Sequence, residues 1–209
     1  MEKIIENRII ENGIIKPITL EFNDEQKSIR VTDDYIDISY GTSATPARVL
    51  SNLYPYKFDY FDNPVCSMEA AIQSLKYENI DIRKACYKYA GIDAWHLRGM
   101  APYAWQKDGI LYTPVKKINR FSEEYQDFLD KLYFMIYQNP LFRNNLKHSG
   151  VKKLDHTIGE DDYDQTTLTR TEYISRLYAL RYCLHNQLLE SDEVVKVLKM
   201  VRTQLKGGD

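Results

Sequence analysis

The sequence predicts an α+β fold in which a mainly helical body follows a small β region at the N-terminus. Three observations predict it. Short runs of β-branched and aromatic residues, separated by turn signals, occupy residues 1–61. Apolar residues then recur at helical spacing from Ser67 onward. Hydrophobic residues make up 44% of the 209 positions, which is enough for a buried core. We therefore expect a β extension over residues 1–35, a main domain over residues 36–190 and a last helix over residues 191–209 that packs on it.

The β region is expected to begin with a hairpin. Asn12-Gly13 suits a type I′ turn and lies between the pairs Ile9-Ile10 and Ile14-Ile15. Further strands are expected over residues 18–22, 28–32, 35–40 and 57–61. In residues 35–40, Tyr, Asp and Ser alternate with Ile, Ile and Tyr, which is typical of a strand. Asp62-Asn63-Pro64 is then expected to turn the chain into the helical part.

The helical part is expected to begin at Ser67, a good N-cap for a helix with apolar residues at i, i+4 and i+7. Thr169 and Glu172 form a capping box at the start of a later helix. The other expected elements are a helix over residues 82–97, a structured loop over residues 100–120, a helix from Ser122 that Asn139-Pro140 ends, a short helix over residues 141–148 that Gly150 ends, a loop over residues 155–169 and a last helix from Ser191 to Gly207.

The charge balance argues against a protein that coats nucleic acid. The chain has 28 Lys and Arg against 30 Asp and Glu, a formal net charge of -2, whereas such coating depends on bulk positive charge. Apolar runs are far shorter than the roughly 20 residues that a membrane helix needs. The start of the chain alternates charged residues with Ile, unlike a signal peptide. We expect a cytoplasmic protein without a membrane partner.

Several kinds of enzyme lack their motifs here. Cys66, Cys86 and Cys183 are far apart and form no C-x-x-C pair, and the four His show no metal-ligand spacing. The sequence has no P-loop, no G-x-G-x-x-G and no G-x-S-x-G. We therefore expect neither a metal nor another cofactor.

One helix carries a polar stripe. Glu69, Gln73 and Lys76 follow the spacing i, i+4, i+7, so they lie on one face of the helix that begins after Ser67. One interpretation is a solvated face with a carboxylate near the helix N-terminus. The other is a site that breaks a bond between a sugar and a nitrogen. There the carboxylate stabilises charge at the anomeric carbon or moves a proton, and the amine attacks that carbon once desolvation leaves it neutral.

Three further features also have a structural and a functional interpretation. Ser51-Asn52 is either an ordinary turn or a pair of ligand contacts. The acidic segment Glu160-Asp161-Asp162 with Tyr163 is either solvated or a contact for ribose hydroxyls or a cation. Trp95 and Trp105 either pack in the core or stack on a base.

The order of these segments resembles the NADAR (YbiA-like) domain over residues 36–185. The segments that carry the resemblance are Tyr40-Gly41-Thr42-Ser43, Leu50-Ser51-Asn52-Leu53-Tyr54-Pro55, the helix from Ser67 to Tyr77, Tyr133 to Phe142, Leu146 to Gly150 and Glu160-Asp161-Asp162. The family has S-x-E-H-x-x-Q-x-x-K-F on the helix, where this chain has Ala70 in place of His. Its Y-W-G is replaced by Tyr163-Asp164-Gln165.

The resemblance implies cleavage of N-glycosidic bonds in ADP-ribosyl or phosphoribosyl conjugates, including ADP-ribosylated guanine in DNA. It assigns Lys76 as an amine for a Schiff-base route, Glu69 as the acid/base and Asp162 as a second carboxylate. The residues expected to bind the substrate are Asn52, Ser51, Gln73, Tyr40 and Tyr163.

This implied function comes with partners and alternatives. The implied partners are an ADP-ribose or phosphoribosyl compound and ADP-ribosylated DNA. The N-terminal 35 residues have no counterpart in a minimal domain of this family, and they are expected either to pair two protomers through their strands or to cover the site. A phage-encoded member would work in the host cytoplasm. The altered Y-W-G segment leaves two alternatives open: a module that binds a nucleotide or ADP-ribose ligand without cleaving it, and a phage–host interaction protein.

Overall fold

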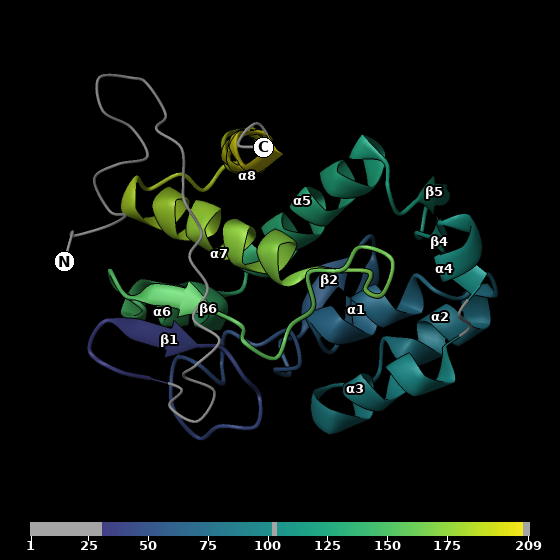
Figure 1. The fold of residues 1–209 in the computed structure, drawn as a ribbon, viewed down its shortest axis with the longest axis horizontal. Helices are drawn as coiled ribbons and strands as arrows, with labels where there is room; N and C mark the ends of the chain where they lie inside the picture. Colours follow the sequence, from purple (N-terminus) through teal and green to yellow (C-terminus); the bar gives the residue numbers. More distant parts are fainter. Residues whose placement is uncertain (1–30, 102–103, 207–209) are drawn as a thin grey trace.

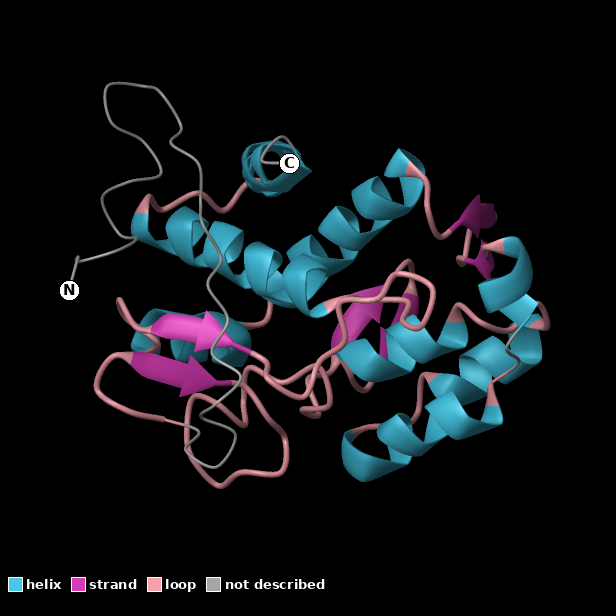
Figure 2. Cartoon of the chain, viewed as in Figure 1, coloured by secondary structure: helices cyan, strands magenta, loops and turns pink. Residues whose placement is uncertain are grey.

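A computed structural model describes residues 31–101 and 104–206 of the chain (Figure 1). The predicted α+β class is confirmed, because this part folds into eight helices and three two-stranded sheets (Figure 2). The predicted hairpin around Asn12-Gly13 lies outside the described residues. In the part that the structure describes, each helix is too short or too polar to cross a membrane.

The elements follow one another along the chain in the order β1 (Tyr35–Asp37), β2 (Phe58–Tyr60), β3 (Asn63–Val65), α1 (Met68–Ser74), α2 (Ile80–Cys86), α3 (Gly91–Met100), α4 (Ala104–Asp108), β4 (Ile110–Tyr112), β5 (Lys117–Asn119), α5 (Glu123–Tyr137), α6 (Pro140–His148), β6 (Lys153–Asp155), α7 (Arg170–His185) and α8 (Ser191–Lys206).

The predicted helix starts are confirmed where cap chemistry marks them. The Ser67 hydroxyl accepts a hydrogen bond from the Ala70 amide and begins α1. Thr169 and Glu172 form the predicted capping box of α7. Ser122 caps α5, which ends at Tyr137, and Asn139 caps the next helix, α6. These contacts are local, so their residues specify them without help from the rest of the fold.

Two expectations for the middle of the chain were wrong. Residues 82–97 form parts of two helices, α2 and α3, because the chain turns between them and enters α3 through Gly91 at φ +59°, a value that favours glycine. Residues 100–120 hold the helix α4 and the antiparallel hairpin β4–β5 rather than a loop. The Thr113 hydroxyl closes this hairpin by accepting from the Lys116 amide at 3.0 Å.

Two details of the β region also differ. The hairpin β2–β3 turns at Phe61 and Asp62, whose φ values of 47° and 63° fit a type I′ turn, so Pro64 lies in β3 instead of in the turn. In β1, the alternation of polar and apolar residues does not produce an exposed face, because Tyr35 to Ser39 are all buried. Asp37 is satisfied there by the amide and hydroxyl of Thr157, at 2.9 and 2.8 Å.

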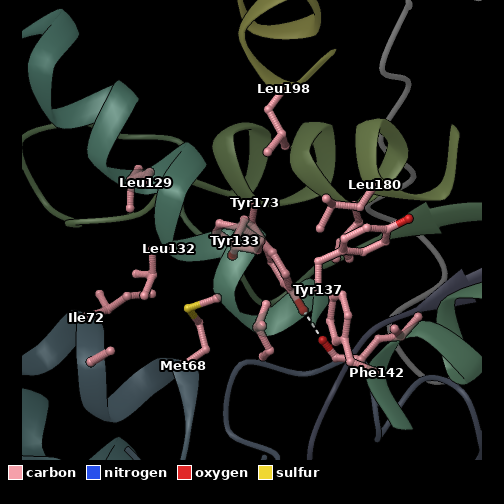
Figure 3. Packing of buried hydrophobic residues seen from close by; sticks show 14 of the residues in the cluster. Met68, Ile72, Leu129, Leu132, Tyr133, Tyr137, Phe142, Tyr173, Leu180 and Leu198 are labelled. Carbon is pink, nitrogen blue, oxygen red and sulfur yellow. Dashed lines mark hydrogen bonds between the residues drawn. The ribbon is translucent and has the colours of Figure 1, made fainter. Parts of the chain in front are cut away.

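The core joins the helices to the parallel pair β1–β6. Figure 1 shows α7 and α5 meeting near the centre of the molecule, with α8 above α7 and α1 below α5. Met68 and Ile72 of α1 meet Leu132 of α5, Tyr173 of α7 and Leu198 of α8 in one apolar cluster (Figure 3). The side of α1 that faces this core is therefore apolar, and its polar stripe lies beside it.

A network of buried ion pairs also links α5, α7 and α8. Arg120 donates to both oxygens of Glu172, at 3.0 and 2.8 Å. Arg176 and Arg202 both reach Asp130, at 2.8 and 3.1 Å. Because all these groups are buried, each depends on its partners to remain charged.

Candidate functional site

The polar stripe of α1 is partly enclosed. The Gln73 amide donates to Glu69 Oε1 at 2.7 Å. Gln73 is only 6% exposed, while Glu69 and Lys76 are half-buried. A face of this kind is not the fully solvated one that periodicity alone allows. The structure thus brings a carboxyl, an amide and an amine together at the edge of the core.

The end of α1 positions Lys76. The helix ends at Ser74, and the Lys76 amide then donates to the Gln73 carbonyl at 3.3 Å. The Tyr112 amide of β4 donates to the Leu75 carbonyl at 2.7 Å, which ties this end of α1 to the β4–β5 hairpin. Lys76 is therefore held by backbone contacts on both sides.

The amine of Lys76 lies near an aromatic ring and within reach of two opposite charges. Its Nζ is 5.8 Å from the ring centre of the buried Trp105. Among the described residues, no carboxylate oxygen lies close enough to this Nζ, within 4.0 Å, to form an ion pair. Burial lowers the pKa of Lys76 to about 8, an effect that the Glu69 carboxylate opposes and the Arg98 guanidinium reinforces. An appreciable fraction of this amine is therefore neutral near neutral pH.

Glu69 shows the opposite perturbation. Burial raises the pKa of its carboxyl, while the Gln73 hydrogen bond and the charges of Lys76 and Arg98 lower it. An acid with a raised pKa beside an amine with a lowered one is the arrangement that favours proton transfer between a site and its substrate.

One hydrogen-bonding atom of the site lacks a partner. Gln73 Oε1 is buried and accepts no hydrogen bond from the described residues. In this orientation it is the amide nitrogen that contacts Glu69. A buried acceptor without a donor is costly, so this oxygen is suited to a hydroxyl or amino group of a ligand.

The segment around Asn52 borders the same face. The Asn52 carbonyl accepts from the Glu69 amide at 2.9 Å, and its side-chain oxygen accepts from the Tyr133 hydroxyl at 3.3 Å. The Ser51 hydroxyl accepts from the Leu53 amide at 3.3 Å, which is a turn contact. Asn52 therefore joins the site, while Ser51 shapes the turn that places it.

The Tyr40 side chain packs against Gly91, the first residue of α3. Arg48 is stacked on its ring, 4.6 Å from the centre. A methyl group added at Gly91 would come within 2.8 Å of the Tyr40 hydroxyl, so the two residues are in close contact. Tyr40 thus borders the helix that packs on α1.

Asp162 and Tyr163 lie in an exposed loop. The Asp162 carboxylate accepts from the Asp164 amide at 2.8 Å, and within the described residues no hydrogen bond or ion pair joins it to Glu69 or Lys76. Tyr163 packs against Arg120 at 5.0 Å. The loop contacts α4, where the Gln106 amide donates to Gln165 Oε1 at 3.4 Å. The role expected for Asp162 stays a prediction.

Sequence reasoning missed Tyr133 and Arg98. Tyr133 continues the apolar face of α5 and packs 6.2 Å from Tyr173 (Figure 3), so its spacing indicates only a core residue. Arg98 is exposed and stacks on Trp95 at 3.8 Å from the ring centre. Its spacing from Trp95 within one helix turn is the signal that was available.

Among residues 31–101 and 104–206, no three His, Cys, Asp or Glu side chains are grouped so that they could hold a metal ion. The functional groups of the site are the Glu69 carboxyl, the Gln73 amide and the Lys76 amine.

Comparison with known proteins corrects the family. A family model described as bacteriophage protein GP30.3 matches residues 44–182, which include α1 to α6 and most of α7. The resemblance to the NADAR domain was therefore wrong. Its motifs were short runs of common residue types, such as Ser-Asn and a helix with Glu and Gln one turn apart, and these recur without common descent.

No curated protein and no solved structure matched the chain. The expected phage origin agrees with the description of the family. Because the match extends over more than half of the sequence, the chain belongs to the family of bacteriophage protein GP30.3.

Proposed function

We propose that the chain is an N-glycosidase that breaks the bond between a sugar and a base nitrogen in an ADP-ribosyl or phosphoribosyl conjugate. The single observation that carries this proposal is the cluster of Glu69, Gln73 and Lys76 on α1. It combines a perturbed acid, a buried acceptor that has no partner among the described residues and an amine that is partly neutral.

The cluster suits each step of such a reaction. The neutral Lys76 amine attacks the anomeric carbon, and the bond from that carbon to the base breaks. Glu69 in its acid form gives its proton to the leaving nitrogen. The Lys76 nitrogen then gives up a proton and forms a double bond to the anomeric carbon, while the bond from that carbon to the ring oxygen breaks and the oxygen takes the proton. Water adds to this iminium, which releases the sugar as an aldehyde and restores the amine.

The surroundings suit a phosphorylated ribose. Gln73 Oε1 needs a donor, which a ribose hydroxyl provides. Arg98 is exposed, its guanidinium carbon lies 3.8 Å from the ring centre of Trp95, and its charge acts on the pKa of both Glu69 and Lys76. A guanidinium in this position suits a phosphate group.

The test measures products by mass spectrometry. The full chain is incubated with NAD⁺, with a phosphoribosyl amine and with an oligonucleotide ADP-ribosylated on guanine. We expect release of a free base from at least one of them. Lys76→Ala and Glu69→Gln should abolish this release with little change in melting temperature, and the exposed Lys147→Ala on α6 serves as the matched control. Full activity in both site variants would refute the assignment.

A second candidate is a module that binds the same ligands without cleaving them. The exposed position of Asp162, away from contact with the stripe, favours it, since a second catalytic carboxylate is then missing from the cluster. This candidate predicts that the ligand is recovered intact while it raises the melting temperature. A chain whose melting temperature does not respond to millimolar ADP-ribose would instead act as an interaction protein.

A further inference from the structure

A second feature lies where α5 and α8 adjoin. A hollow with a volume of about 530 Å³ opens between α5 and α8, the two helices at the top of Figure 1. Its described lining includes Lys131, Phe134 and Met135 from α5 and Val195, Lys196 and Lys199 from α8. The hollow shares no residue with the stripe of α1.

The lining comes from one stripe on each helix. On α5 the residues follow the spacing i, i+3, i+4, and on α8 Asp192, Val195, Lys196 and Lys199 follow i, i+3, i+4, i+7. The opposite side of α8 already packs in the core through Val194, Val197, Leu198 and Val201. The hollow therefore uses a second side of α8, which the core does not need.

The floor of the hollow is apolar and its rim is basic. Phe134, Met135 and Val195 are half-buried, so each leaves apolar surface uncovered. Methionine adapts readily to different apolar partners. The three lysines are exposed at the rim, and among the described lining residues Asp192 brings the single carboxylate.

The lysines remain available to a partner. Lys199 reaches Asp127 at 3.6 Å, but both side chains are largely exposed, at 59% and 44%. An ion pair of this kind contributes little to stability, so a second carboxylate can replace it. Within the described residues, Lys131 and Lys196 have no ion pair.

We propose that this hollow docks an acidic, amphipathic helix of another protein. Apolar side chains at i, i+3, i+4 and i+7 of that helix enter the hollow, and carboxylates on its flanks meet the three lysines. The concave shape favours inserted side chains over a flat membrane surface. The excess of lysines over carboxylates in the lining favours an acidic partner over a basic one.

The test uses two synthetic helical peptides with identical leucine spacing, one flanked by Glu and the other by Lys. Fluorescence anisotropy measures their affinity for the full chain at low and high salt. We expect the acidic peptide to bind at least tenfold more tightly than the basic one, and to weaken as salt rises.

Three variants complete the test. Lys131→Glu combined with Lys196→Glu should reverse the preference between the peptides, and Val195→Asp should weaken the acidic peptide. Lys147→Glu, exposed on α6 and outside the hollow, should leave both affinities unchanged. Thermal melts check that each variant is folded.

Other outcomes overturn the proposal. Equal binding of the two peptides, or binding of neither, refutes an acidic helix as the occupant. Wild-type dimers that Val195→Asp dissociates in sedimentation would make a second copy the occupant instead. Binding to phosphatidylserine vesicles without binding to the peptide would identify the surface as a membrane contact.

Discussion

The lowered pKa of the Lys76 amine makes a prediction that needs no substrate. With a pKa of about 8, about a quarter of the amine is neutral at about pH 7.5, whereas an ordinary lysine with a pKa near 10.5 is only ~0.1% neutral there. The neutral form is the nucleophile. We divide the reaction rate of each lysine at about pH 7.5 by the rate of the same lysine at its high-pH plateau. This normalised rate should be about two hundredfold higher for Lys76 than for an ordinary lysine.

The assay is pulse labelling with 1-fluoro-2,4-dinitrobenzene, a reagent that does not itself titrate, between pH 6.5 and 11, followed by quantitative peptide mass spectrometry. Dividing each rate by its plateau removes differences in access between lysines, and the exposed Lys147 provides a reference within the same sample. We expect the labelling of Lys76 to reach half its plateau near pH 8. A labelling profile of Lys76 that coincides with the profile of an ordinary lysine would refute the electrostatic description of the site.

Two variants test the causes with opposite signs. The Glu69 carboxylate raises the pKa of Lys76, so Glu69→Gln should move the labelling midpoint to lower pH. The Arg98 guanidinium lowers it, so Arg98→Ala should move the midpoint to higher pH. Shifts in the reverse directions would show that these charges do not act on the amine.

The remaining predictions concern stability, measured as the free energy of unfolding in urea. Glu172→Gln breaks the buried pair with Arg120 and should cost about 3 kcal/mol or more; a loss below about 1 kcal/mol would mean that this pair is not buried as described. Gly91→Ala should cost about 1–3 kcal/mol, because its φ of 59° is left-handed and the added methyl group meets Tyr40. Gly99→Ala in the same helix has open space and should stabilise by about 0.5 kcal/mol; equal effects of the two alanines would contradict the geometry of α3.

Features that depend on local chemistry could be predicted from the sequence. The caps at Ser67, Ser122 and Thr169 were found because a hydroxyl and an amide three residues later suffice to form them. The stripe of Glu69, Gln73 and Lys76 was found because helical spacing fixes which side chains share a face.

Features that depend on distant contacts could not. The parallel pairing of Ile36 with Leu154 joins strands more than a hundred residues apart, and the residues of neither strand indicate which strand it pairs with. Arg120 and Arg176 look like surface residues in the sequence, yet both are buried because acids on other elements meet them. The break between α2 and α3 depends on Gly91 fitting against Tyr40, a contact that periodicity does not reveal.

The position of Asp162 shows the same limit for the site. Its role as a second carboxylate came from the resemblance to the NADAR domain, and it stays a prediction. The side chain lies in an exposed loop, where it accepts from the Asp164 amide. Residues that complete the site, such as Tyr133 and Arg98, come from helices whose packing on α1 was not apparent in advance.

The central claim is that the Lys76 amine bonds covalently to a sugar carbon. Adding cyanoborohydride during incubation with an oligonucleotide ADP-ribosylated on guanine, or with NAD⁺, reduces an iminium to a stable secondary amine. The account predicts a sugar adduct on the peptide that contains Lys76, absent from Lys76→Ala. Base release with no adduct at Lys76, or an adduct that persists on another lysine in that variant, would contradict it.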